Sequence, residues 1–204
     1  MNGNNFADSV RDAKSTELDR LGSQQLLVAL TGADLEPEVV LTAVAGSEHT
    51  AAETFAEWAE VSEQELFARL HEQERDHYER VIAELDAFDP GGVDSMHERL
   101  RELNDDVSRA GGLVGRSLVG DKTLLQVVNF FVNKADERRA GLFRDLRADT
   151  KQNVGDGVSL LADCCDGEAD WNYARETAAE IVQIAYDDYA DTLTEMGLDP
   201  KPIC

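Results

Sequence analysis

Proline occurs at only four positions of this chain, 37, 90, 200 and 202. A proline inside a helix removes a backbone hydrogen bond and clashes with the preceding turn, so this spacing leaves two long stretches free to be helical. Apolar residues recur at helical intervals through both stretches, and no segment alternates strictly between apolar and polar residues as a half-buried strand does. The sequence therefore predicts an all-α fold.

Start and stop signals divide the chain into seven expected helices. Pro37 suits the first turn of a helix, and Ser62 followed by Glu65 has the form of a capping box. Asp94 is interpreted as the N-cap of a further helix, which is expected to fray at Gly111-Gly112. The expected helices cover roughly residues 6–30, 37–59, 62–88, 95–111, 122–147, 158–165 and 168–196.

The length of 204 residues fits one domain. We expect residues 1–204 to form a single helical domain in which the helix pairs 36–88 and 122–196 build a four-helix bundle. Residues 1–32 and 93–118 are expected to be accessory helices outside that bundle.

The charge of the chain indicates the salt concentration at which the protein works. It carries 42 acidic and 19 basic residues, a formal net charge of -23, and only five of the basic residues are Lys. At 1 M salt the Debye length falls to about 3 Å, so repulsion within such a surface is screened. We interpret the composition as adaptation to high salt, with an acidic protein of ordinary salt as the alternative. In either case direct nucleic-acid binding is not expected.

Neither a secretory leader nor an apolar run long enough to cross a bilayer is recognised, so a cytoplasmic protein without membrane association is expected. The three cysteines, Cys164, Cys165 and Cys204, have no CxxC spacing, which disfavours a zinc or iron–sulfur centre built from them. They are interpreted as free thiols, the adjacent pair partly buried, and their role is left open.

Three ionisable residues fall on otherwise apolar helix faces. Glu48 lies in the middle of the apolar stripe of residues 37–59, and Glu74 and His77 lie inside the stripe of residues 62–88. Burying these groups without partners would cost several kcal/mol, so something must compensate. A Glu and a His three residues apart can bind one metal ion together with a Glu from a neighbouring helix. The alternative is that Glu74 and His77 lie partly exposed at a helix edge.

The sequence around these residues reads AGSEHTAA over 45–52 and QERDHY over 73–78. It resembles the ferritin-like superfamily, in particular the rubrerythrin-like branch as found in halophilic archaea, over roughly residues 36–88. The resemblance implies a ferritin-like four-helix bundle with a carboxylate-bridged di-iron centre and peroxide or oxygen chemistry. It also implies that Glu48, Glu74 and His77 are metal ligands.

The second half of such a dinuclear site is not found. No histidine follows His97, and in residues 122–147 Glu137 lies off the apolar stripe whereas Arg139 lies on it. In residues 168–196 only Asp188 touches the stripe. Ferroxidase or peroxidase activity needs two metal ions held close together, so it is not expected. Arg139 could pair with Glu48 or Glu74 in place of a metal, or extend its head into water.

Two functions follow from these residues. The first is metal binding, with iron or another divalent metal at the half-site and a role in oxidative stress. The second is a metal-free ferritin-like scaffold that acts through a protein partner or as a homodimer, with Arg139 supplying the charge of the metal. The environment of Glu74 distinguishes them. No nucleophile elbow or phosphate-binding loop points to a hydrolase or a nucleotide-binding protein.

Overall fold

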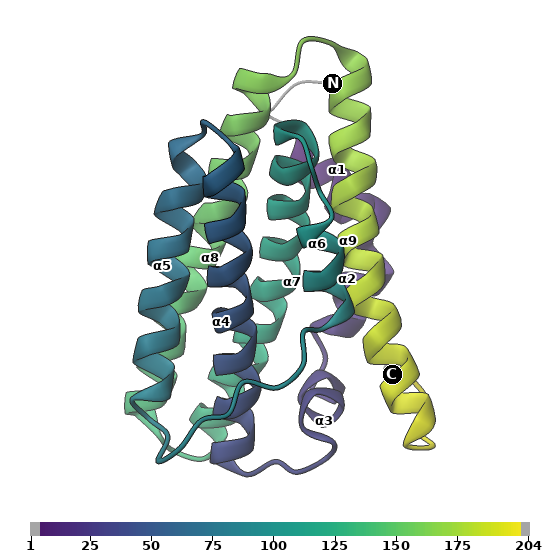
Figure 1. The fold of residues 1–204 in the computed structure, drawn as a ribbon. Helices are drawn as coiled ribbons and strands as arrows, with labels where there is room; N and C mark the ends of the chain where they lie inside the picture. The colour runs from purple at the N-terminus through teal and green to yellow at the C-terminus, as the bar shows by residue number, and fades with distance from the viewer. Residues whose placement is uncertain (1–4, 201–204) are drawn as a thin grey trace.

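A computed structural model describes residues 5–200, and all regular secondary structure in this range is helical. The predicted all-α class is confirmed. Five long helices run roughly lengthwise through the molecule, and the short ones flank them (Figure 1). None of the helices in the described range is both long and apolar enough to cross a membrane. The helices are α1 (Phe6–Ala13), α2 (Ser15–Leu21), α3 (Gln25–Thr31), α4 (Pro37–Val61), α5 (Glu65–Ile82), α6 (Ser95–Arg101), α7 (Asp106–Asn133), α8 (Glu137–Cys164) and α9 (Glu168–Glu195).

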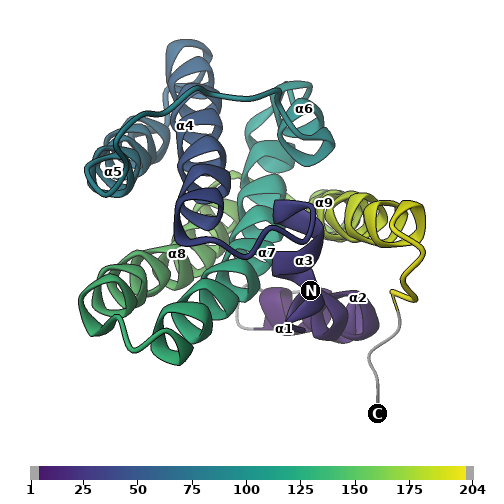
Figure 2. The ribbon, with the colours of Figure 1, turned by 90° about the horizontal axis from the view of Figure 1, so that it is seen from below.

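The long helices pack in three main pairs. α4 packs on α5, and α7 packs on both α8 and α9. Seen from below, α4, α5, α7 and α8 surround a common interior, while α9 lies on the side of α7 away from α5 (Figure 2). The helices α1, α2 and α3 all contact α9 and α7. The segment between α5 and α6 crosses over α4 (Figures 1 and 2).

The bounds predicted for the middle of the chain are wrong. Residues 122–147 are not one helix, because α7 ends at Asn133 and α8 begins at Glu137, with a positive φ of 58° at Ala135 between them. The predicted helix 158–165 is the end of α8. Half of the supposedly accessory segment 93–118 belongs to α7, and the helices around the common interior come from residues 37–82 and 106–164 instead of 36–88 and 122–196.

The other predicted helix ends are partly confirmed. α4 begins at Pro37, and the Asp94 carboxylate accepts a hydrogen bond from the backbone N–H of His97 at 2.9 Å as the N-cap of α6. The predicted helix 6–30 is three short helices. The expected capping box is not formed, because Gln64 is the N-cap of α5 and the Ser62 hydroxyl accepts from the backbone N–H of Gln64 at 3.2 Å while donating to the Asp106 carboxylate at 2.8 Å.

Two glycines let α9 approach α7 closely. Gly111 and Gly115 lie one helical turn apart, and a Cβ atom at Gly111 would lie 2.5 Å from the backbone oxygen of Ala174. A Cβ at Gly115 would lie 2.6 Å from the backbone oxygen of Ala178. The predicted fraying at Gly111-Gly112 does not occur, because α7 is continuous there and packs its backbone against α9.

This close approach predicts opposite effects of alanine at two helix positions. Gly111→Ala is expected to lower the free energy of unfolding by about 1–3 kcal/mol, because the helices must move apart. Gly141→Ala is the control, since nothing lies within 4 Å of its added Cβ. It should raise stability by up to about 1 kcal/mol through helix propensity. Urea denaturation of both variants checks this, and a Gly111→Ala variant as stable as the original chain would contradict the packing.

The apolar core consists of two clusters that meet near the middle of the bundle. One contains Phe55, Phe67 and Leu113, and the other contains Val44 and Phe143. The charged residues Glu48, Glu74, His77 and Arg116 are buried without belonging to either cluster. The fold therefore holds a polar centre inside a bundle that is apolar above and below it.

Candidate metal centre

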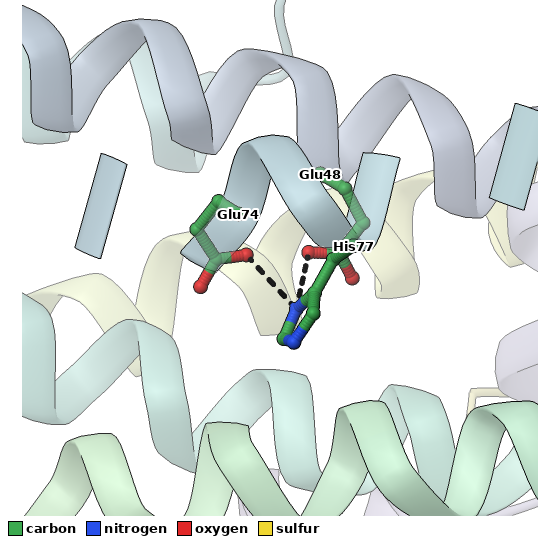
Figure 3. A group of neighbouring side chains, drawn as sticks. All are labelled: Glu48, Glu74 and His77. Carbon is green, nitrogen blue, oxygen red and sulfur yellow. Dashed lines mark ion pairs between the residues drawn. The ribbon is translucent and has the colours of Figure 1, made fainter. Parts of the chain in front are cut away.

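The three residues singled out on the helix faces come together in the interior. Glu48 projects from α4, and Glu74 and His77 project from α5 at the same level (Figure 3). Their exposed fractions are 5%, 0% and 1%, so the edge-exposed alternative for Glu74 and His77 is wrong. One donor atom from each residue lies within 4.8 Å of the others, and such a group could hold a metal ion.

His77 is fixed between acidic groups on both sides of its ring. Nδ1 lies 3.7 Å from Glu48 Oε2 and 3.7 Å from Glu74 Oε2. On the other side, Nε2 lies 3.2 Å from Asp149 Oδ2 on α8. A carboxylate oxygen accepts, so Nε2 is the donor of this hydrogen bond. A carboxylate on one imidazole nitrogen orients the ring and directs the other nitrogen to a metal in many metal sites.

Arg116, from α7, binds the same carboxylates. Its Nη1 and Nη2 donate to the two oxygens of Glu74 at 3.1 Å each, and Nη2 lies 3.7 Å from Glu48 Oε2. The guanidinium lies over the ring of Phe55, 5.4 Å from its centroid. This bidentate contact is the strongest geometry available to an arginine and a carboxylate.

Burial and proximity shift the pKa values in this group. Burial, followed by repulsion from Glu74, raises the pKa of Glu48 to about 7. Burial acts to raise the pKa of Glu74 as well, but the Arg116 guanidinium, Glu48 and His77 together outweigh burial and hold that pKa below its usual range. Burial acts to lower the pKa of His77, yet Glu48 and Glu74 raise it to about 10.

The charges of these four side chains sum to zero when His77 carries its second proton. Two carboxylates then face one guanidinium and one imidazolium. A neutral ring that donates through Nε2 would instead point the lone pair of Nδ1 at two carboxylate oxygens, which is repulsive. Nδ1 therefore requires either a proton or a metal ion on the side that faces Glu48 and Glu74.

Three buried atoms in this group have no hydrogen-bond partner within the described residues: Arg116 Nε, Glu48 Oε2 and His77 Nδ1. The last two of these atoms are neighbours. Their separation of 3.7 Å is too long for a hydrogen bond. It is close to the roughly 3.3–3.6 Å between two ligand atoms of a tetrahedral zinc ion with bonds of about 2.0–2.2 Å. Glu74 Oε2 lies at the same distance from Nδ1, and all three donor atoms lie within 4.8 Å of one another, so the group could hold one divalent ion.

The residues on the other two helices do not fit a second ion. α7 contributes Arg116 and the neighbouring Ser117, which is fully buried. On α8, Asn153 lies between Asp149, which meets His77, and Asp156, which pairs with Arg69, so it lies near the level of Glu74. Ser117 and Asn153 are poor metal ligands compared with carboxylates and imidazoles. The donors could therefore hold one ion.

The prediction that Arg139 pairs with Glu48 or Glu74 is wrong. Arg139 donates to Glu84 at 3.1 Å from the start of α8, because α8 begins two residues before it and turns it toward the end of α5. Arg116 makes the predicted contact instead. Sequence reasoning missed Arg116 and Asp149, although ionisable groups on the inner faces of α7 and α8 could have been noticed once those helices were correctly bounded.

The cysteines stay apart from this centre. Cys164 and Cys165 are free thiols at the end of α8 and are partly buried, as predicted. Burial raises the pKa of the Cys164 thiol to about 12, so it is a poor nucleophile at neutral pH. Cys204 lies outside the described residues.

No family profile, curated protein or solved structure matches this chain.

Proposed function

We propose that this chain is a ferritin-like helical protein that binds one divalent metal ion, iron, manganese or zinc, through Glu48, Glu74 and His77. The observation that carries the proposal is the convergence of Glu48 Oε2 and His77 Nδ1, both buried and without a hydrogen-bond partner in the described part of the chain, on one point beside Glu74. Asp149 supports it, since its contact with Nε2 leaves Nδ1 for the metal.

The ferritin-like part of the proposal rests on the sequence resemblance over residues 36–88 and on the four helices that surround the ligands. Arg116 stands where a second half-site would contribute its carboxylates, so the proposed site is mononuclear. A bound ion would supply a Lewis-acid centre there. Glu74 would be held by Arg116, and the apolar clusters would lie on both sides of the ion. The role in oxidative stress would then depend on one metal.

One observation favours a second candidate, a metal-free scaffold. The paired contact between Arg116 and Glu74 already compensates the carboxylate that is fully buried, and a protonated His77 compensates Glu48. In this case the centre is an internal ionic group that fixes the relative positions of α4, α5 and α7. A partner protein or a second copy would then carry the function.

Metal titration separates the two candidates. Chelator-treated protein in molar KCl is titrated with Zn²⁺, Mn²⁺ and, without oxygen, Fe²⁺ by isothermal titration calorimetry. We expect one equivalent of at least one of these ions to bind. Glu48→Gln should weaken binding more than tenfold, or by more than about 1.4 kcal/mol. Glu53→Gln is the matched control, because Glu53 is half exposed on the same helix. Absence of binding for all three ions would favour the metal-free scaffold.

The high-salt adaptation is also proposed, on the net charge of -23. We expect the free energy of unfolding to rise steadily from low salt to molar KCl, because screening relieves repulsion among the carboxylates. Thermal unfolding across a KCl series measures it, with sucrose as the uncharged control for general stabilisation. A melting temperature that sucrose raises but KCl leaves unchanged would contradict salt adaptation.

A further inference from the structure

A cavity of about 420 Å³ lies beside the charged centre, between α3, α4, α7 and α9. This volume is within the range of roughly 300–1,000 Å³ that is usual for small-molecule sites. The segment between α5 and α6 borders it where that segment crosses α4 (Figures 1 and 2). The function proposed above does not use this space.

The floor of the cavity is apolar with a polar end. Buried lining residues include Leu21, Leu26 and Leu124, which offer contact to a hydrocarbon body. Glu48 and Arg116 also line it, with side chains only 6% and 5% exposed. Glu48 Oε2 and Arg116 Nε are buried and have no hydrogen-bond partner among the residues the structure describes.

The rim of the cavity is acidic, whereas its floor is apolar. Asp89, Asp94 and Asp188 line it, and Asp89 and Asp94 are exposed. Ser95 ties two of these groups together, since it follows Asp94 and its hydroxyl donates to Asp188 Oδ1 at 3.0 Å. Asp94 pairs with His97, whereas Asp89 and Asp188 have no ion pair in the described range.

Among the described residues that line the cavity, the only basic one is Arg116, and both of its terminal nitrogens are bound to Glu74. Apart from the buried Nε–H of Arg116, the charged groups of the cavity are therefore carboxylates, above an apolar floor. An anionic guest would be repelled at the rim, and a guest without a charge would gain no attraction from the rim carboxylates.

We propose that this cavity binds a small organic ammonium compound, with the ammonium group held between Asp94 and Asp188 and an apolar body on the floor. The occupant is recognised by charge at the rim and by burial of hydrocarbon below it. The cavity and the proposed metal site share Glu48, which forms part of the polar end. The ammonium group is proposed to lie at the rim instead, between Asp94 and Asp188, so its binding does not require a metal ion.

Three probes of matched shape test the site in chelator-treated protein at fixed molar KCl: 2-phenylethylammonium, 2-phenylethanol and 3-phenylpropanoate. Isothermal titration calorimetry should show the ammonium probe binding about tenfold more tightly than the alcohol, which corresponds to about 1.4 kcal/mol, and no binding of the carboxylate. Equal binding of all three probes, or no binding of the ammonium probe, would overturn the proposal.

Two adjacent aspartates on α9 provide the matched variants. Asp188→Asn should weaken binding of the ammonium probe by roughly threefold to tenfold and leave the alcohol unchanged. Asp187→Asn removes the same charge one residue away, at an exposed position that does not line the cavity, and should change neither. Ala185→Phe, which fills the cavity from α9, should remove binding of both probes. Equal effects of the two aspartate variants would show attraction to the overall charge only and would overturn the site.

Discussion

Arg116→Met is expected to lower the free energy of unfolding by about 3–5 kcal/mol in metal-free protein, because it leaves the Glu74 carboxylate buried without its cation. Glu74 is fully buried, and Arg116 supplies both of the hydrogen bonds that the structure assigns to its oxygens. For a chain of this size that loss corresponds to a melting temperature lower by roughly 6–20 °C. Thermal and urea denaturation in chelator and molar KCl measure it.

A double variant that should restore stability and a matched control variant accompany this experiment. Glu74→Gln combined with Arg116→Met should recover most of the loss, because both buried charges are then gone. Arg139→Met should lower stability by about 1 kcal/mol or less, because its partner Glu84 keeps the contact with Arg138 near the surface. If Arg116→Met and Arg139→Met had equal effects, the buried ionic group would not contribute as described.

His77→Gln is expected to weaken metal binding at least a hundredfold, because it removes the only nitrogen ligand of the proposed site. His71→Gln is the matched control on the same helix, since His71 is partly exposed and its Nδ1 contacts the backbone oxygen of Ala52 instead. Competition with a chelating dye measures both affinities. Equal affinities of the two variants would place the metal elsewhere.

Asp149→Asn tests the same site through the carboxylate that contacts Nε2 of the ligand His77. It should weaken metal binding by about 10–100-fold, the usual effect of losing the carboxylate that orients a ligating histidine. Asp149 is half exposed and belongs to α8, so this change leaves the three ligands in place. A structural role alone would lower stability without changing affinity, and that outcome would remove Asp149 from the metal centre.

The sequence alone located the three proposed metal ligands for a simple physical reason. Glu48, Glu74 and His77 lie on helices whose apolar stripes are regular, and the structure buries all three. An ionisable group in the middle of such a stripe is buried regardless of how the helices are arranged. Their convergence also follows from pattern, because α4 and α5 are consecutive and antiparallel, and residues on facing stripes then meet.

The partners of these residues could not be found in the same way. Arg116 lies on a segment that was assigned to an accessory helix, and Gly111-Gly112 suggested an end where the structure has a continuous α7. The helix persists because those glycines allow contact with α9 and Leu100, which is tertiary information. The real break near Ala135 carries no proline or glycine, and its local signal is the N-cap Asp136, which accepts from the backbone N–H of Arg139 at 3.0 Å and was not recognised. With that break unseen, Arg139 was placed on the wrong face.

Anomalous diffraction at the absorption edge of the metal, from crystals of the metal-loaded protein, tests the central claim most directly. The proposal predicts one peak about 2.0–2.2 Å from Glu48 Oε2, Glu74 Oε2 and His77 Nδ1, with Arg116 still bound to Glu74. A map with no peak at this point, in crystals where Arg116 and a protonated His77 hold the two carboxylates, would contradict it.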